Sequence, residues 1–311
     1  MKKNITINDI AKACGISPTV ASAALRNKKG SVRFSQELRE KVLATAKKMN
    51  YQQNRLASAV ASGKSPFVAV FLHHDSSEYS LPVNFYLHDT LTAAAFALHK
   101  SGYEMVFVPY SDEEEQVKRI ESMLSGKLVA GVITNFIIGH NRELFSLLKK
   151  TTPPYVVLGN PNGAKLHCCN INKDLIDFKL DEYRIRRGFK DKVVLGVKGE
   201  TLQIEAGNQD FIRLDWNSEL FKKTDTLFCP TGSECAKRLI ERKKVSPDIM
   251  LVVDDYRLPI EFRPVMQIRQ PQRERAELCA NFIVEWIATG SPSKNKLNSL
   301  SVKEEDIRMV S

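Results

Sequence analysis

The chain has 311 residues and a mass of 35.1 kDa, enough for two or three domains with buried cores. Its composition, 43% hydrophobic and 26% charged, is that of an ordinary soluble globular protein. No run approaches the roughly 20 apolar residues of a membrane span. The amino-terminal residues also lack the apolar stretch of a signal peptide, so we expect a cytoplasmic protein without a membrane partner.

The net charge is concentrated at the amino-terminal end. The first 65 residues contain nine Lys, four Arg and three acidic residues, which equals the +10 of the whole chain, so the remainder is neutral. Each Lys or Arg that neutralises a phosphate releases a condensed counterion, so a compact basic module predicts a polyanionic partner. The alternative, a solvated or disordered basic segment, does not explain the patterned apolar residues within it.

A helical repeat of apolar residues over residues 6–13 predicts the first element. Thr6, followed three residues later by Asp9, is typical of a helix start with a capping box. Gly15 is expected to end this helix, because glycine tolerates the left-handed conformation that follows a C-cap.

Two further helices are predicted in the basic segment. The second, PTVASAALRN, starts with Pro18 after the N-cap Ser17, and its small alanine side chains let it approach another surface closely. The third runs from the cap residue Ser35 to residue 50. Its predicted apolar face consists of Leu38, Val42, Leu43 and Ala46. Helix, glycine-containing turn, helix and supporting helix indicate a helix-turn-helix domain, with a three-helix interaction module as the alternative.

The next segment, YQQNRLASAVASGKS, favours DNA as the polyanion. It has no acidic residue, and Asn54 and Arg55 are candidates for minor-groove or phosphate contacts. A short helical pattern precedes a break at Gly63.

The stretches ITINDIAKACGISPTVASAALRN and FSQELREKVLATAKKMNYQQNRLASAV resemble the DNA-binding headpiece and hinge helix of the lac repressor family, over residues 4 to about 62. The resemblance implies a recognition helix on bases and phosphates, and a hinge helix with an apolar wedge in the minor groove. The residues implied in DNA binding are Thr6, Ser17, Thr19, Val20, Ser22, Arg26, Arg33, Ser35, Asn54, Arg55, Ala57 and Val60. Ala23 stands where the family has an Arg, and Val60 replaces the wedge Leu, so a different half-site and a less sharp kink are expected.

From Phe67 onward, predicted strands alternate with predicted helices. The strands are continuously apolar, which is typical of a parallel sheet covered on both faces. Strands are predicted at 67–74, 103–110, 131–136, 155–160, 192–197, 226–230 and 248–255, and helices at 84–102, 113–126, 141–150, 233–244 and 273–290. Alternation over this length indicates two α/β lobes.

This neutral module resembles the periplasmic-binding-protein-like effector domain of the same family, with the landmarks NFYLHDTLTAAAFALHKSGYEM, VVDD and IRQP. The resemblance implies a small sugar-like ligand between the lobes, at the carboxyl ends of strands. The candidate effector-binding residues are His74, Phe85, Asn135, Asn172, Trp216 and Asp254. Two features depart from the family: Thr231-Gly232 replaces an Asn-Asp pair, and KGETLQIEAGNQDFIRLDW, which is a poor helix, stands where a segment with a sugar-clamping Arg is expected.

No catalytic or cofactor motif is present: the sequence has no P-loop, GxSxG or HExxH. The run His73-His74-Asp75 has no fixed ligand spacing, so ordinary polar residues at a strand end are the preferred interpretation. The six cysteines are scattered, and we expect buried thiols, with a redox-active Cys168-Cys169 pair as the alternative. We therefore expect no enzyme, no metal and no cofactor.

Together these patterns predict an α/β protein in three parts: a helix-turn-helix domain (1–53), a hinge helix and linker (54–65), and a two-lobed domain for effector binding and dimerisation (66–311). The predicted function is a sequence-specific transcriptional regulator, a repressor that binds a palindromic operator as a homodimer under the control of a sugar-like effector. One alternative is an effector-independent regulator with a degenerate cleft. The other is a metabolite-binding protein or sugar-processing enzyme with a basic head.

Overall fold

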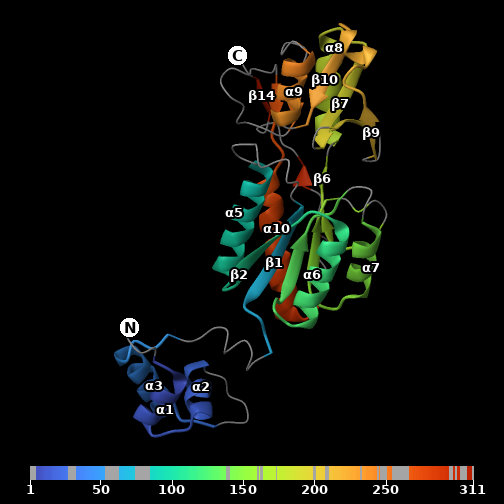
Figure 1. The fold of residues 1–311 in the computed structure, drawn as a ribbon. Coiled ribbons are helices and arrows are strands. Elements are labelled where there is room, and N and C mark those ends of the chain that lie inside the picture. Colours follow the sequence, from blue (N-terminus) through green and yellow to red (C-terminus); the bar gives the residue numbers. More distant parts are fainter. Residues whose placement is uncertain are drawn as a thin grey trace. The chain divides into compact units, whose positions relative to one another are not determined.

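A computed structural model divides the chain into two units, Met1–Ser65 and Pro66–Ser311 (Figure 1). The residues that the structure describes are 5–26, 33–52, 63–73, 85–137, 141–159, 161, 164–172, 174–198, 201–206, 210–231, 233–243, 245, 251–253, 266–293, 297, 300–301 and 307–309.

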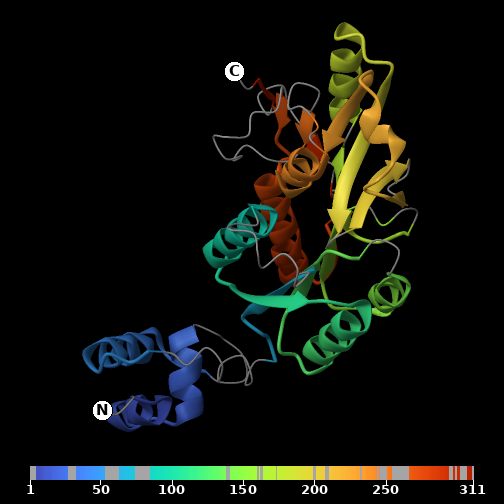
Figure 2. The same cartoon turned by 45° about the horizontal axis from the view of Figure 1, so that its top comes forward.

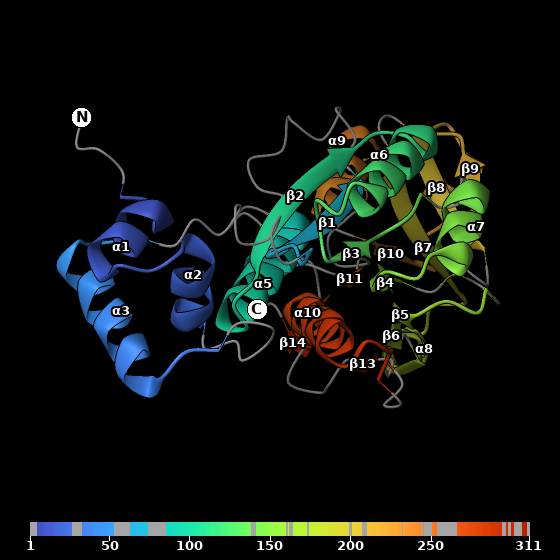
Figure 3. The same ribbon diagram turned by 90° about the horizontal axis from the view of Figure 1, so that it is seen from below.

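Within residues 5–26 and 33–52, the first unit forms three helices. Its helices are α1 (Ile7–Cys14), α2 (Pro18–Arg26) and α3 (Gln36–Lys48) (Figures 1 and 3). The predicted helix starts and stops are confirmed: Thr6 and Asp9 form a capping box, and Gly15 ends α1 in the left-handed conformation with φ 72°. The Ser35 side chain accepts a hydrogen bond from the Leu38 amide and caps α3.

A small apolar core joins the three helices. Its buried members are Ile10, Cys14, Ala24, Val42 and Ala46. The prediction that Leu43 shares this face of α3 was wrong, because its side chain is 37% exposed. Val42 and Ala46 are one helical turn apart and face α1 and α2, whereas Leu43 is rotated by about 100° from Val42 and lies outside their stripe.

The first lobe of the second unit contains a five-stranded parallel sheet. The strands are β1 (Phe67–His73), β2 (Glu104–Tyr110), β3 (Gly131–Thr134), β4 (Tyr155–Leu158) and β5 (Cys168–Cys169), in the order β2-β1-β3-β4-β5. Helices α6 (Glu113–Ser125) and α7 (Arg142–Lys150) cover one face, and α5 (Phe85–Lys100) and α10 (Gln272–Thr289) cover the other (Figures 1 and 2). Coverage of both faces explains why these strands are apolar throughout.

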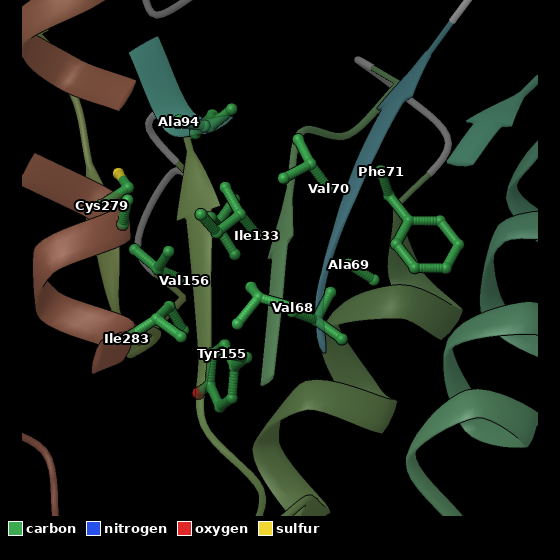
Figure 4. Close-up of a cluster of buried hydrophobic side chains, with 14 of the residues drawn as sticks. Val68, Ala69, Val70, Phe71, Ala94, Ile133, Tyr155, Val156, Cys279 and Ile283 are labelled. Carbon is green, nitrogen blue, oxygen red and sulfur yellow. The ribbon is translucent and has the colours of Figure 1, made fainter. Parts of the chain in front are cut away.

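Helix α10 comes late in the sequence but packs in the first lobe, against α5 and strands β3, β4 and β5. Its residues Cys279 and Ile283 lie beside Ile133 and Val156 of the sheet (Figure 4). At the other end of α10, Trp286 packs against Tyr155, with ring centroids 5.8 Å apart. Because Tyr155 begins β4, α10 runs antiparallel to the strands.

The second lobe is built on three smaller sheets. Its elements are β6 (Ile171–Asn172), α8 (Asp174–Arg186), β7 (Asp191–Lys198), β8 (Thr201–Ala206), β9 (Asp210–Leu214), a 3-10 helix (Glu219–Lys222), β10 (Thr226–Pro230), α9 (Ser233–Lys243), β11 (Leu251–Val253), β12 (Met266–Ile268), β13 (Leu300–Ser301) and β14 (Ile307–Met309). The strand orders are β10-β7-β8-β9, β11-β12-β14 and β13-β6. Helices α8 and α9 pack in two separate apolar clusters, so both helices contribute to the lobe's core.

The segment expected to depart from the family forms an antiparallel hairpin. Strands β8 and β9 pair with each other, and β8 pairs antiparallel with β7. The strand–helix alternation predicted a parallel sheet throughout, and this prediction was wrong for the second lobe, where β7, β8 and β9 pair antiparallel. Helix α8 was also not predicted, because seven charged residues in DLIDFKLDEYRIR obscure its apolar stripe of Ile176, Leu180 and Tyr183. Within the described ranges, no helix is both long and apolar enough to cross a membrane.

Candidate DNA-binding and effector-binding sites

Helix α2 has one face in the headpiece core and one face outside it. Ala21, Ala23 and Ala24 are buried, and their small side chains let α2 sit close to α1 and α3. Thr19 is exposed, while Val20 and Ser22 are half-buried. Ser17 is exposed and caps the helix, its hydroxyl oxygen accepting from the Val20 amide at 3.3 Å.

The position of Ala23 refines one expectation. This residue stands where the lac repressor family has an Arg, and its side chain is only 7% exposed. The outer face of α2 therefore offers short hydroxyl side chains, Thr19 and Ser22, in place of a long cationic one.

Three of the other implied DNA contacts lie at helix starts. Thr6 begins α1, and its hydroxyl and backbone amide donate to the Asp9 carboxylate at 2.7 and 2.8 Å. Arg33 is exposed just before Ser35, which caps α3. The positive end of a helix dipole favours anions, so exposed side chains at these helix starts are suited to phosphates.

Sequence reasoning missed one basic residue that holds the headpiece together. The Lys41 ammonium on α3 donates to the Cys14 carbonyl at 3.4 Å, at the carboxyl end of α1. A cation is favoured there by the helix dipole. Only the fold brings these two positions together, since they are 27 residues apart in the chain.

Most of the remaining residues predicted to bind DNA lie outside the part of the chain that the structure describes. Arg26 is the last residue of α2, and its side chain is not described. Asn54, Arg55, Ala57 and Val60 lie outside the described residues.

In the first lobe, Asn135 sits at the carboxyl ends of three strands. Its side-chain oxygen accepts from the His73 amide and from the Tyr110 hydroxyl, both at 2.8 Å. Gln116 of α6 donates to Thr134 at 2.7 Å and to the Asn135 carbonyl at 2.9 Å. This network fixes Asn135 at the edge where ligands bind in open α/β folds.

Sequence reasoning missed Tyr110 and Gln116 as positioning residues. Both are almost fully buried, and burial raises the pKa of Tyr110, so its hydroxyl remains a donor at physiological pH. The sequence did contain a signal for both residues: Tyr110 is a polar residue at the end of a predicted strand, and Gln116 is a polar residue on the apolar face of a predicted helix.

Among the other predicted effector residues, Trp216 is the one whose side chain is described. Trp216 packs within the second lobe, stacked on Phe221 with centroids 6.5 Å apart and beneath the Arg242 guanidinium at 5.1 Å. Phe85 begins α5 and Asn172 ends β6, but their side chains are not described. His74 and Asp254 lie outside the described residues.

The cysteines are free thiols. Cys169 and Cys279 are hydrogen-bonded to each other, which lowers the pKa of Cys169, whereas burial raises the pKa of Cys279 well above its usual value. Among the described residues, no group of three His, Cys, Asp or Glu could hold a metal ion.

Comparison with known proteins gives a family match for the first unit and similar proteins for the longer chain. Residues 6–54 match the model of bacterial regulatory proteins of the lacI family. The HTH-type transcriptional regulator MalR of Streptococcus pneumoniae is 25% identical over 193 residues, 62% of this chain and 57% of that protein. Catabolite control protein A of Staphylococcus epidermidis is 27% identical over 262 residues, 81% of this chain and 74% of that protein.

The chain thus spans little more than half the length of the first MalR relative. Its fold is similar to the crystal structure of the lac repressor dimer bound to operator and the anti-inducer ONPF, with a TM-score of 0.71 and 15% identity, over 99% of this chain and 98% of that chain. The amino-terminal domain thus matches the lacI family model over residues 6–54, the chain is similar to transcriptional regulators along most of its length, and its fold is that of the lac repressor.

Proposed function

We propose that this protein is a sequence-specific transcriptional repressor that binds a palindromic DNA operator as a homodimer. It acts on DNA in the cytoplasm by binding and not by catalysis. One headpiece covers only a half-site, so two copies related by a two-fold axis read the two halves of a palindrome.

One observation carries this proposal: a folded headpiece, matched to the family model, holds the whole net charge of the chain and leaves Thr19 exposed on α2. The same domain also exposes Lys12, Lys47 and Lys48. Phosphate contacts from such residues provide affinity and orientation, and the α2 side chains read base edges.

The second unit is proposed to bind a small sugar-like effector. Asn135, held at the strand ends, is the described residue best placed to contact it. Effector binding would change the closure of the two lobes and so the separation of the two chains at Ser65–Pro66. That separation biases the hinge segments, residues 54–65, toward or away from their DNA-bound form.

The test is selection of bound duplexes from a random pool by the full-length protein. We expect a palindromic motif, with affinity that falls as salt rises. The Thr19→Ala variant is expected to lose preference at one position in each half-site, while Leu43→Ala, a change outside the α2 face, keeps the motif. No preference over bulk competitor at moderate salt would refute the proposal.

A second candidate is a regulator that no longer responds to an effector. The β8–β9 hairpin favours it, because this hairpin occupies the segment where the family carries a sugar-clamping Arg. Thermal-shift screening of the full chain separates the two, because a ligand raises the stability of the state it binds.

A further inference from the structure

Helix α10 carries a buried guanidinium group that pairs with no carboxylate of the described residues. Arg275 is 7% exposed, and its Nη2 donates to the side-chain oxygen of Gln272. Its Nε atom is enclosed and has no hydrogen-bond partner. Its Nη1 atom donates no hydrogen bond to a described residue either, but it is not among the enclosed atoms. The Arg275 guanidinium therefore has fewer hydrogen-bond acceptors than donors, and its Nη1 atom is accessible to a ligand.

Two carboxylates on the helices α10 and α5 are engaged with other cations. Glu274 pairs with Arg269 at 3.1 Å, and Asp89 lies 3.8 Å from Arg273 and 3.2 Å from the Nδ1 atom of His88. Arg275 forms no ion pair with any described residue. Arginine does not lose its proton in proteins, and a buried cation without a counter-charge destabilises the fold. A ligand with negative charge would remove this imbalance.

Arg275 lies at the ligand-binding edge of the first lobe. Its guanidinium carbon is 5.7 Å from the ring centre of Tyr86, the second residue of α5. Its charge also helps to lower the pKa of Cys169, after the larger effect of the Cys279 hydrogen bond, and Cys169 ends β5. Since α10 and α5 both begin at the carboxyl ends of the strands, this is the same edge that carries Asn135.

The surroundings suit an anion in two respects. The Tyr86 ring lies over the guanidinium, and the Nη1 donors, in the plane of the group, are the ones left for an oxygen of a carboxylate or phosphate. No side chain caps the start of α10, whose N-cap is Pro271. The Gln272 amide donates to the Gln270 carbonyl at 2.8 Å, but the next backbone N–H groups of the first turn and the positive end of the helix dipole add to the attraction.

We propose that Arg275, together with the first turn of α10, binds the anionic group of the effector, a carboxylate or a phosphate ester. The inference rests on the proposed effector function and specifies its ligand class: a small polyol that carries a negative charge. The family's Arg in the second lobe is absent, and the anion-binding charge is supplied from the first lobe.

The test compares four probes on the full-length protein: glucose, gluconate, glucose 6-phosphate and inorganic phosphate. Binding is measured by calorimetry and by the rise in melting temperature. Gluconate or glucose 6-phosphate is expected to bind at least about tenfold more tightly than glucose, because charge-assisted hydrogen bonds to a buried Arg are strong. The comparison of the two acids identifies which oxyanion fits, and phosphate alone tests whether the anion suffices.

Arg275→Met is expected to lose this preference and, without ligand, to melt at a higher temperature, since an uncompensated buried charge is removed. Arg275→Lys keeps the charge but not the planar fork, and should bind with intermediate affinity. Arg119→Met removes one positive charge from α6 of the same lobe and serves as the matched control, with unchanged preference.

Three results would overturn the assignment: equal binding of the anions by the wild type and Arg275→Met, no preference for any anion over glucose, or a lower melting temperature of unliganded Arg275→Met. Operator binding by the unliganded wild type, measured in parallel, reports on the proposed function separately. If it persists while the anions fail, only the assignment of Arg275 is lost.

Discussion

Replacement of Ile10 by Ala is expected to unfold the headpiece while the second unit stays folded. Ile10 is fully buried in the core that joins α1, α2 and α3. The change removes three carbon groups worth about 0.8 kcal/mol each in transfer free energy, and the cavity raises the cost to about 2–5 kcal/mol. A single core in a domain below about 70 residues supplies roughly 3–5 kcal/mol, so little stability would remain.

The assay is differential scanning calorimetry of the full-length variant combined with operator binding. We expect the headpiece transition to disappear, operator affinity to fall to the level of non-specific DNA, and the transition of the second unit to remain, because its cores share no residue with the headpiece. Leu43→Ala is the control: the side chain is 37% exposed, and a cost of about 1 kcal/mol or less is expected. Operator binding by Ile10→Ala equal to that of Leu43→Ala would refute the reasoning.

Three further changes test other parts of the molecule. Thr19→Ala should leave the free energy of unfolding within about 0.5 kcal/mol and weaken operator binding by about 1–3 kcal/mol, measured by fluorescence anisotropy; a loss of stability instead would assign Thr19 to the fold. Tyr110→Phe removes the hydroxyl that donates to Asn135 and should cost about 1 kcal/mol in urea unfolding, whereas no change would mean that the network does not hold Asn135. Burial lowers the pKa of His167, so the folded unit binds fewer protons than the unfolded chain, and the free energy of unfolding should fall as pH drops below about 6.5. The His167→Phe variant should lose that part of the pH dependence in melting curves, and an unchanged profile would show that His167 is not its source.

Local signals made the headpiece predictable from the sequence. The start of α1 at Thr6, its end at Gly15 and the cap at Ser35 are short-range effects of side-chain hydrogen bonding and backbone conformation. The parallel sheet of the first lobe was also predictable, because its strands are apolar on both faces. The prediction that Leu43 belongs to the core was wrong. The predicted apolar face of α3 included both Val42 and Leu43, and α1 and α2 cover only the narrower stripe that contains Val42.

The second lobe and the site were less accessible to sequence reasoning. The sequence between β8 and β9 contains Gly207-Asn208, a dipeptide typical of hairpin turns, so a signal for this pairing was available; it was missed because the segment was compared only with the helix expected there. The positions of Tyr110, Gln116 and Arg275 depend on contacts between elements far apart in the chain, and no local pattern reports such contacts.

The late position of α10 has a consequence for synthesis of the chain on the ribosome. Cys279 and Ile283 complete the core of a lobe that begins at Phe67, so nearly the whole polypeptide must emerge before that lobe can close. Until then, the apolar side of β3 and β4 is open to solvent and to chaperones. The core of the amino-terminal domain needs only the first 52 or so residues, so a nascent chain carries a folded first unit ahead of an incomplete second unit.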